Sequence, residues 1–338
     1  MICGIVDIGS NTIRLSVYRC EGGENRLLMH RKTMAGVASY IKSGRLPSEG
    51  VRIVCKTLTE YKKLLDNLDI PKMHVFATAP LRNISNTEEV VESILEETGI
   101  SVNVISGEEE AVLSFTGATL GITHKAGVML DLGGGSTEIL RYEDGKILST
   151  YSLPIGSLNL FNRYVNGFYP TEDERKKIRK AVEEQLERAN VDLSPAAHIC
   201  GVGGTVRAAS QVANHFFCRA DDYNIISVEE LKMLLKRIKK PDADNVHELL
   251  KIVPDRIHTI IPGLIVLETI SKALDAEEIT VSMCGVREGY LIKNVIRTCG
   301  APSQSPSATA PPEGEPSFAA RDNLGSPSGR AGRPVGAD

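Results

Sequence analysis

The sequence has no excess of positive charge and no long apolar run, and each absence excludes a class of protein. Its formal net charge is −4 and its pI is about 6.0. Nucleic acid is therefore excluded as the main partner, because binding along a phosphate backbone needs a basic face. Any polyanionic substrate must be met by a local basic patch. No stretch reaches the roughly 18 apolar residues of a membrane span, so we expect no membrane partner.

Paired cysteines are also lacking. The chain has seven cysteines, an odd number, and none of them forms a Cys-x-x-Cys pair. This scatter indicates neither a disulfide framework nor a cysteine-based zinc site. The first residues lead directly into an apolar strand without a basic leader region, so we expect a reduced, cytoplasmic location.

The chain length predicts two folded lobes. A domain has roughly 100 to 200 residues, and the chain has 338, of which 42% are hydrophobic. We predict a first lobe over 1–123 and a second over 124–299, whose C-terminal helix is in a position to pack back on the first. The segment 300–338 is rich in Pro, Ser, Ala and Gly without apolar periodicity, so we expect it to be disordered.

One short motif occurs twice, each time after an apolar strand and before a second strand. The copies run from Asp7 to Thr12 and from Asp131 to Glu138, and each contains Asp-aliphatic-Gly followed by hydroxyl-bearing residues. Glycines let backbone N–H groups approach a phosphate, and an aspartate beside them can hold a cation. A single copy is equally typical of a β-hairpin. The repetition, with similar flanking strands and turns, indicates two homologous lobes with a ligand between them.

The patterns between the motifs predict mixed α/β sheets with covering helices in both lobes. Helices are predicted from their apolar spacing and from capping boxes, in which an N-terminal polar residue pairs with an acid three residues later. The predicted helices cover 51–68, 86–98, 108–120, a region after Thr171, 206–212, a region after Ser227, 254–274 with an interruption at Pro262-Gly263, and 286–296. The predicted later strands cover 73–78, 102–105, 146–152, 197–202 and 279–283.

Three further features could carry chemistry, and each has a structural alternative. Glu108, Glu109 and Glu110 begin a helix, where acids stabilise the helix dipole, although one could also orient a water for attack on phosphorus. Arg82 follows a strand and can grip phosphoryl oxygens, although a lone loop arginine is often only solvated. The turn at 201–205 presents N–H donors at a helix start, or serves close helix–sheet packing.

Taken together and in this order, the motifs resemble those of the Ppx/GppA phosphatases, which are exopolyphosphatases and guanosine pentaphosphate phosphohydrolases. The matching stretches extend from residue 5 to 290 and are 6–15, 77–82 with Asn86, 105–111, 131–138, 201–205 and 285–289. The resemblance implies a two-lobed, actin-like ATPase fold of the α/β class. It also implies Mg²⁺-assisted (or Mn²⁺-assisted) hydrolysis of a terminal phosphoanhydride.

The resemblance also implies roles for individual residues. Glu110 matches the glutamate that deprotonates the attacking water, with Glu109 left open as an alternative. Asp131 and Glu138 match the pair of acidic residues that the family associates with the metal ion and the attacking water. Asp7 matches the corresponding metal-binding aspartate of the first loop. The implied phosphate-binding residues are Ser10, Asn11, Arg82, Gly133, Gly134, Gly135, Ser136 and Thr137, and a third loop, which can contact a nucleotide, contributes Gly203, Gly204 and Thr205.

The substrate stays open at this level. Longer members of the family add a helical HD-type domain that grips long polyphosphate, and we expect no such domain here, because the segment predicted to be disordered directly follows the last predicted helix. We therefore expect short polyphosphates as substrate, with guanosine pentaphosphate (pppGpp) as the alternative. An actin-like ATP-dependent kinase and a non-catalytic nucleotide sensor are further alternatives. A homodimer is compatible with an exposed apolar helix at 254–274, which could equally belong to the core.

Overall fold

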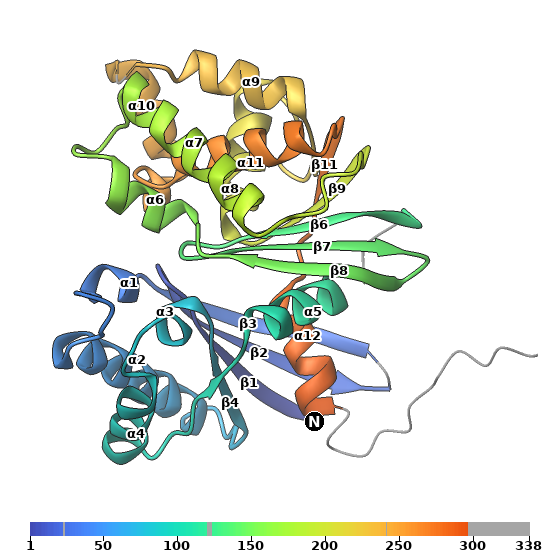
Figure 1. Cartoon of the computed structure of the whole chain (residues 1–338). Helices are drawn as coiled ribbons and strands as arrows, with labels where there is room; N and C mark the ends of the chain where they lie inside the picture. Colours follow the sequence, from blue (N-terminus) through green and yellow to red (C-terminus); the bar gives the residue numbers. More distant parts are fainter. Residues whose placement is uncertain (23, 120–123, 241, 297–338) are drawn as a thin grey trace, which may run out of the picture. The chain divides into compact units, whose positions relative to one another are not determined.

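A computed structural model describes residues 1–22, 24–119, 124–240 and 242–296. These residues form two mixed sheets, each covered by helices (Figure 1). The predicted disordered segment 300–338 lies outside the described residues. Within the described part, no helix is both long enough and apolar enough to cross a membrane.

The first sheet contains the first copy of the repeated motif. Its strand order is β3-β2-β1-β4-β5, in which β2 is antiparallel to β1 and β3, and β4 is parallel to β1 and β5. The strands are β1 (Ile2–Ile8), β2 (Ile13–Glu21), β3 (Glu24–Thr33), β4 (Met73–Ala77) and β5 (Asn103–Val104).

The second sheet repeats this plan with one additional strand. Its order is β8-β7-β6-β9-β11-β10, with β6, β9 and β11 parallel and the other pairs antiparallel. The strands are β6 (Ala126–Leu132), β7 (Thr137–Glu143), β8 (Lys146–Leu153), β9 (His198–Val202), β10 (Ile225–Ser227) and β11 (Glu278–Val281).

The duplication extends to the geometry of the two motif loops. In the first loop the Gly9 amide donates to the Thr12 carbonyl at 3.0 Å, and in the second the Gly133 amide donates to the Ser136 carbonyl at 3.0 Å. A Cβ on either glycine would lie 3.1 Å from that same carbonyl oxygen. The two loops therefore close in the same way, and glycine is the residue that fits both.

Helices of the first lobe pack mainly on one face of its sheet. They are α1 (Val37–Tyr40), α2 (Ser48–Asp66), α3 (Ala79–Arg82), α4 (Thr87–Thr98) and α5 (Gly107–Ala118). The predicted capping box at Asn86 is wrong, because its side-chain amide instead bonds the Leu46 backbone at 3.0 and 3.1 Å. A capping box does occur at Ser106 and Glu109, at the start of α5.

Helices of the second lobe enclose a core centred on one apolar helix. They are α6 (Ser157–Tyr164), α7 (Glu172–Arg188), α8 (Gly204–Phe216), α9 (Val228–Arg237), α10 (Ala243–Ile252) and α11 (Ile260–Ala273). The capping boxes at Thr171 and Ser227 are confirmed. The helix predicted over 254–274 with an interruption at Pro262-Gly263 is interrupted earlier instead. A separate 3₁₀ turn η1 (Pro254–Arg256) precedes α11, and Pro262 lies in the first turn of α11.

Except for the partly buried Ala273, the apolar residues of α11 are buried, so this helix belongs to the core rather than to an exposed dimer surface. The chain then returns to the first sheet through α12 (Val286–Tyr290) and the π-helical turn η2 (Leu291–Ile296). The Tyr290 ring stacks on Phe76 of β4 with centroids 4.6 Å apart. Leu291 and Val295 join the same buried cluster. The lobe boundaries at 123/124 and 299/300 stay a prediction.

Candidate functional site: a phosphate-binding pocket with a buried glutamate

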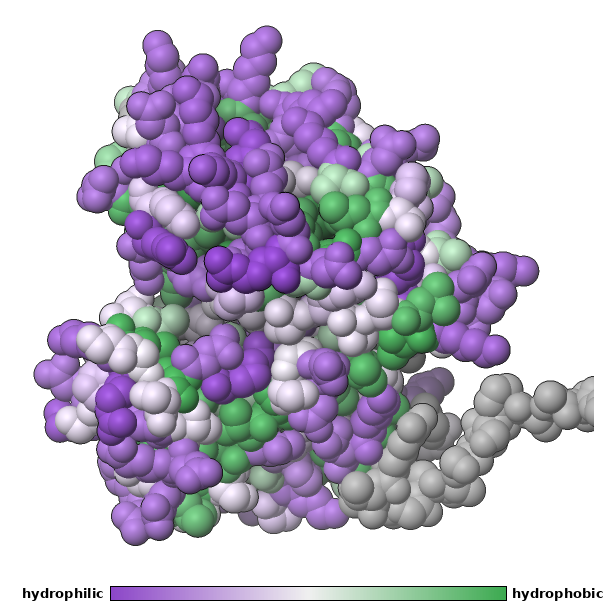
Figure 2. Space-filling model, in the orientation of Figure 1, coloured by the Kyte–Doolittle hydropathy of each residue, from purple (hydrophilic) through white to green (hydrophobic). Residues whose placement is uncertain are grey.

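The two repeated loops and the glycine turn after β9 line one pocket of about 100 Å³. Asp7 lies near the end of β1, Asp131 near the end of β6, and Gly203 directly after β9. Because β1 and β6 each end here beside a parallel neighbour, the pocket occupies the crevice where open α/β sheets bind ligands. On the face drawn in Figure 2, hydrophilic residues cover most of the upper helices, and paler residues of intermediate hydropathy gather where the lobes meet.

The first and second loops are in direct contact. A Cβ on Gly135 would lie 2.3 Å from Ser10 Oγ and 3.3 Å from Ala79 Cβ, so only glycine leaves room for this approach. Asn11 lines the pocket, and its Nδ2 atom is buried without a hydrogen-bond partner. A buried donor without a partner is costly, and a ligand with acceptor oxygens would supply one.

The third loop brings backbone donors and arginines together. Gly203 has a φ of 99°, a conformation that favours glycine. A Cβ on Gly204 would lie 2.3 Å from Arg256 Nη2 and 2.7 Å from Arg14 Nη2, so glycine also lets these guanidinium groups approach. Thr205 is buried and accepts a hydrogen bond from Arg256 Nη1 at 3.3 Å. The N-terminus of α8 thus adds its dipole to a cationic wall.

Four arginines from four elements form this cationic wall. They come from β2, α8, η1 and α12 and are Arg14, Arg207, Arg256 and Arg287. Within the described ranges, none of them forms an ion pair with a carboxylate within 4.0 Å.

Burial, followed by the charge of a neighbouring arginine, lowers the pKa of Arg14 and of Arg256 to about 10, and the pKa of Arg207 is lowered in the same way. With pKa values of about 10, Arg14 and Arg256 stay charged at neutral pH. The four arginines are partly buried, and a cation that is partly removed from water without a carboxylate partner is costly, so an anionic ligand offsets that cost.

Sequence reasoning missed Arg207 and Arg256. Arg14 and Arg287 lay within recognised motif stretches, although no role was assigned to them. The one available signal was the net negative charge, which required a local basic patch for any polyanion. That signal gave no positions, because arginines from distant segments converge only when the chain folds.

The three consecutive glutamates of α5 have different environments. Glu108 and Glu109 are exposed, and the Glu109 carboxylate accepts the Ser106 amide at 2.9 Å in the helix cap. Glu110 is only 8% exposed and lines the pocket. Burial is the main reason that its pKa is raised to about 7, although the charge of Arg82 acts in the opposite direction. Glu110 thus combines access to the pocket with a pKa near neutrality.

Arg82 lies beside the pocket and contacts the buried carboxylates. Its Nη1 donates to Glu110 Oε2 at 2.6 Å, and its Nη2 lies 3.5 Å from Glu138 Oε1 and 3.4 Å from Ser136 Oγ. Arg82 is not among the residues that line the pocket. In this structure the guanidinium therefore orients Glu110 and partly neutralises it.

Only two of the three predicted metal-binding carboxylates lie in the pocket. Asp7 and Asp131 line the pocket and Glu138 does not. Glu138 is 1% exposed and accepts from Ser152 Oγ at 3.0 Å. Burial raises the pKa of all three groups, and the proximity of Glu110 raises that of Glu138 further. Among the residues that the structure describes, the only set of three His, Cys, Asp or Glu side chains whose ligand atoms lie within 4.8 Å of one another is elsewhere.

Most, but not all, of the predicted phosphate-binding residues lie in the pocket. Ser10, Asn11, Gly133, Gly134, Gly135 and Ser136 line the pocket. Thr137 does not, which corrects its assignment: it is completely buried, and its hydroxyl donates to the Ile155 carbonyl at 2.6 Å. As a strand residue that follows the loop, Thr137 directs its side chain into the lobe.

A wider groove continues from the pocket. It has a volume of about 800 Å³ and shares Ser10, Ala79 and Gly135 with the inner pocket. Its remaining lining is mostly neutral, with four asparagines, Phe161 and one cation, Arg163. A ligand can thus place one end among the four arginines and extend into a nearly uncharged groove.

Known proteins share both sequence and structure with this chain. The family described as the Ppx/GppA phosphatase family matches residues 17–298. Exopolyphosphatase 2 of Mycobacterium tuberculosis is 30% identical, over 85% of this chain and 96% of its own length. Exopolyphosphatase 1 of Mycobacterium leprae is 25% identical, over 87% of this chain and 90% of its own length.

A solved structure extends this similarity to three dimensions. The Aquifex aeolicus member of the Ppx/GppA family matches with a TM-score of 0.73 and 25% identity, over 89% of this chain and 99% of that chain. The two-lobed, actin-like ATPase fold expected from the sequence is thereby confirmed.

Proposed function

This chain belongs to the Ppx/GppA phosphatase family and is a hydrolase of phosphoanhydrides, and we propose that it releases the terminal phosphate of inorganic polyphosphate. Relatives named exopolyphosphatase that align over most of both chains support this substrate. The observation that carries the proposal is the buried Glu110 in the same pocket as four arginines without carboxylate partners. That combination provides one group to activate water and four to bind a polyanion.

The arginines and the loops bind the terminal phosphates. Guanidinium groups form strong, often bidentate hydrogen bonds with phosphoryl oxygens. Asn11 Nδ2, the hydroxyl of Ser10 and the amides at the start of α8 add neutral donors around the same space. Phosphoryl transfer depends chiefly on positioning and on charge stabilisation, and donors fixed by the fold supply both without rearranging.

Glu110 accepts the proton of the attacking water. A general base works best when its pKa is near the working pH, and burial raises the Glu110 pKa to about 7. Arg82 holds the carboxylate at 2.6 Å and so fixes its direction. Glu138, 3.5 Å from the same guanidinium, acts on Glu110 through its charge and through Arg82 rather than as a contact to substrate.

Asp7 and Asp131 fit a divalent cation. Both are carboxylates in a pocket without nitrogen or sulfur ligands from His or Cys, and such oxygen donors suit Mg²⁺ or Mn²⁺. Mg²⁺ is commonly held by one or two carboxylates together with substrate phosphates, which agrees with the separation of Glu138 from this pair. When bound, the cation would neutralise charge on the phosphoryl oxygens.

The distribution of cations supports short substrates. Four arginines surround the inner pocket, whereas the outer groove offers only Arg163. Affinity should therefore come from the first few phosphates and gain little from further ones. The same neutral groove, with its asparagine amides and Phe161, is the observation that favours pppGpp as a second candidate, because amides and an aromatic ring can bind a purine.

The test is phosphate release by the purified protein from short polyphosphate, long polyphosphate, pppGpp and ATP, measured side by side with Mg²⁺. We expect the highest kcat/KM on short polyphosphate. Preference for pppGpp would select the second candidate. Activity on ATP alone would contradict both and indicate an actin-like ATPase or kinase. Glu110→Gln protein is the control for phosphatase contamination.

A further inference from the structure

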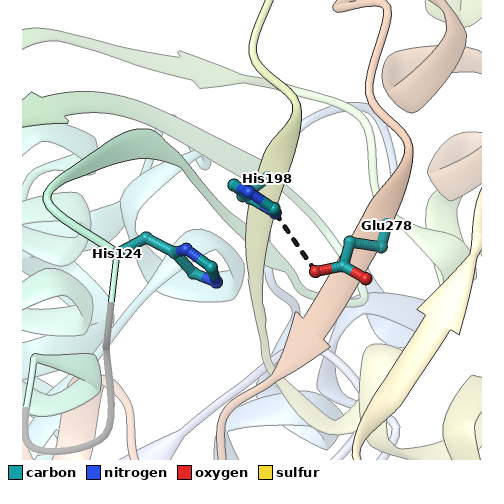
Figure 3. Close-up of side chains that lie close together, drawn as sticks. All are labelled: His124, His198 and Glu278. Carbon is teal, nitrogen blue, oxygen red and sulfur yellow. Dashed lines mark hydrogen bonds and ion pairs between the residues drawn. The ribbon is translucent and has the colours of Figure 1, made fainter.

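Two histidines and a glutamate converge where the parallel strands of the second sheet begin, at the end of the sheet opposite the phosphate pocket (Figure 3). His198 Nδ1 lies 3.1 Å from Glu278 Oε1. The rings of His124 and His198 are stacked, with centroids 3.9 Å apart and planes inclined by 14°. One ligand atom from each of the three side chains lies within 4.8 Å of the other two.

The fold itself creates this convergence. His198 is the first residue of β9 and Glu278 the first residue of β11, and the two are paired neighbours on parallel strands. Their side chains therefore leave the same face of the sheet. His124 lies two residues before β6, the neighbour of β9 on its other side. The cluster thus joins the beginnings of three adjacent strands.

The ligand atoms need only a small movement to bind one ion. Donors 2.0 to 2.1 Å from a tetrahedral metal lie about 3.3 Å apart, compared with at most 4.8 Å here. All three side chains are partly exposed, so rotation about their side-chain bonds can close this gap. His198 also lines a surface hollow of about 310 Å³, which leaves a route for an ion and for its waters.

We propose that His124, His198 and Glu278 form a transition-metal site with a preference for Zn²⁺. Two imidazoles and one carboxylate are a known zinc ligand set, whereas Mg²⁺ prefers oxygen ligands alone. The site is independent of the proposed hydrolysis. His124 and Asp131 are seven residues apart along β6 and the short segment before it, which separates the two sites by roughly 20 Å at 3.3 Å per residue.

Bound zinc would fasten three strand beginnings together and stabilise the folded state. The test uses the full-length protein, freed of metal by a chelator and kept in excess Mg²⁺ so that oxygen-only sites are filled. Calorimetric titration with Zn²⁺ should show one equivalent bound. His198→Ala should weaken this binding by at least about tenfold, the size that even outer-shell changes reach in such sites. Glu278→Gln, which keeps the side-chain shape, should also weaken it.

His215→Ala is the matched control, because His215 Nε2 pairs with Glu248 Oε2 at 2.6 Å and no third His, Cys, Asp or Glu ligand joins them among the residues that the structure describes. This variant should bind zinc as the parent does. Zn²⁺ should raise the melting temperature of the parent and of His215→Ala but not that of His198→Ala. Absence of stoichiometric zinc binding would overturn the proposal. Equal binding, or an equal rise in melting temperature, in the parent and His198→Ala would overturn it as well.

Discussion

Replacing Glu110 with glutamine should remove phosphate release and, at the same time, stabilise the fold above neutral pH. The side chain is buried and carries the proposed proton acceptor. Glutamine keeps the shape and can still accept a hydrogen bond from Arg82, but it cannot take a proton from water. Loss of a general base typically lowers the rate by about 10²- to 10⁴-fold.

The effect on stability follows from the pKa. Burial raises the Glu110 pKa from 4.5 to about 7. Between these values the folded protein binds more protons at this carboxyl than the unfolded chain does, so its free energy of unfolding falls as pH rises. The penalty is almost absent below pH 4.5 and complete above pH 7. At about 1.4 kcal/mol per pKa unit, it reaches about 3 kcal/mol.

Glutamine approximates the protonated acid, so the variant escapes this penalty. We expect the stability difference between Glu110→Gln and the parent to grow by about 2.5 kcal/mol from pH 5 to pH 8, measured by urea unfolding at both pH values. Glu109→Gln is the control, because Glu109 is exposed and belongs to the capping box of α5, in which glutamine can take the same place. It should change activity by no more than about twofold.

Two results would refute this reasoning. If Glu110→Gln retained near-normal kcat, Glu110 would not be the proton acceptor. If Glu109→Gln lost as much activity as Glu110→Gln, the roles that we assign to the exposed and the buried glutamate would be wrong. A stability difference that did not change with pH would contradict the raised pKa separately from the catalytic assignment.

Three other predictions concern the surroundings of Glu110. Arg82→Ala removes the charge that lowers the Glu110 pKa, so the acid limb of the pH–rate profile should move to higher pH; an unmoved limb would argue against the pairing. Arg256→Ala should raise the KM for short polyphosphate by about 10- to 100-fold, as for loss of a hydrogen bond to a charged group, and an unchanged KM would remove Arg256 from the phosphate site. Excess EDTA should abolish phosphate release and added Mg²⁺ should restore it, whereas full activity in EDTA would reject a cation at Asp7 and Asp131.

Local sequence patterns predicted much of the fold. Local geometry favours the glycines of both motif loops, since a Cβ at Gly9 or Gly133 would crowd the carbonyl three residues later. Apolar spacing similarly predicted α2 and α7. The capping boxes at Thr171 and Ser227 each form between two residues that are three positions apart. Interactions of such short range depend little on the rest of the chain.

Predictions failed where a distant partner competed with a local one. Asn86 has the sequence of a helix cap, but its amide bonds Leu46, forty residues away. Thr137 follows a phosphate-type loop, but its hydroxyl bonds Ile155. In both cases a long-range hydrogen bond satisfies the group, and no local pattern contains that information.

The sequence by itself determined the two homologous glycine loops, which the structure places around one pocket, and it predicted that Glu109 or Glu110 would lie beside them. Only the tertiary structure decided which glutamate is buried. Only the tertiary structure, too, brought Arg207 and Arg256 to the glycine loops that the sequence had predicted. The reason is that turn geometry arises within a few residues, whereas burial and charge density depend on which segments share one small volume. The same holds for the cluster of His124, His198 and Glu278, whose members are far apart in sequence and adjacent only because their strands are parallel neighbours.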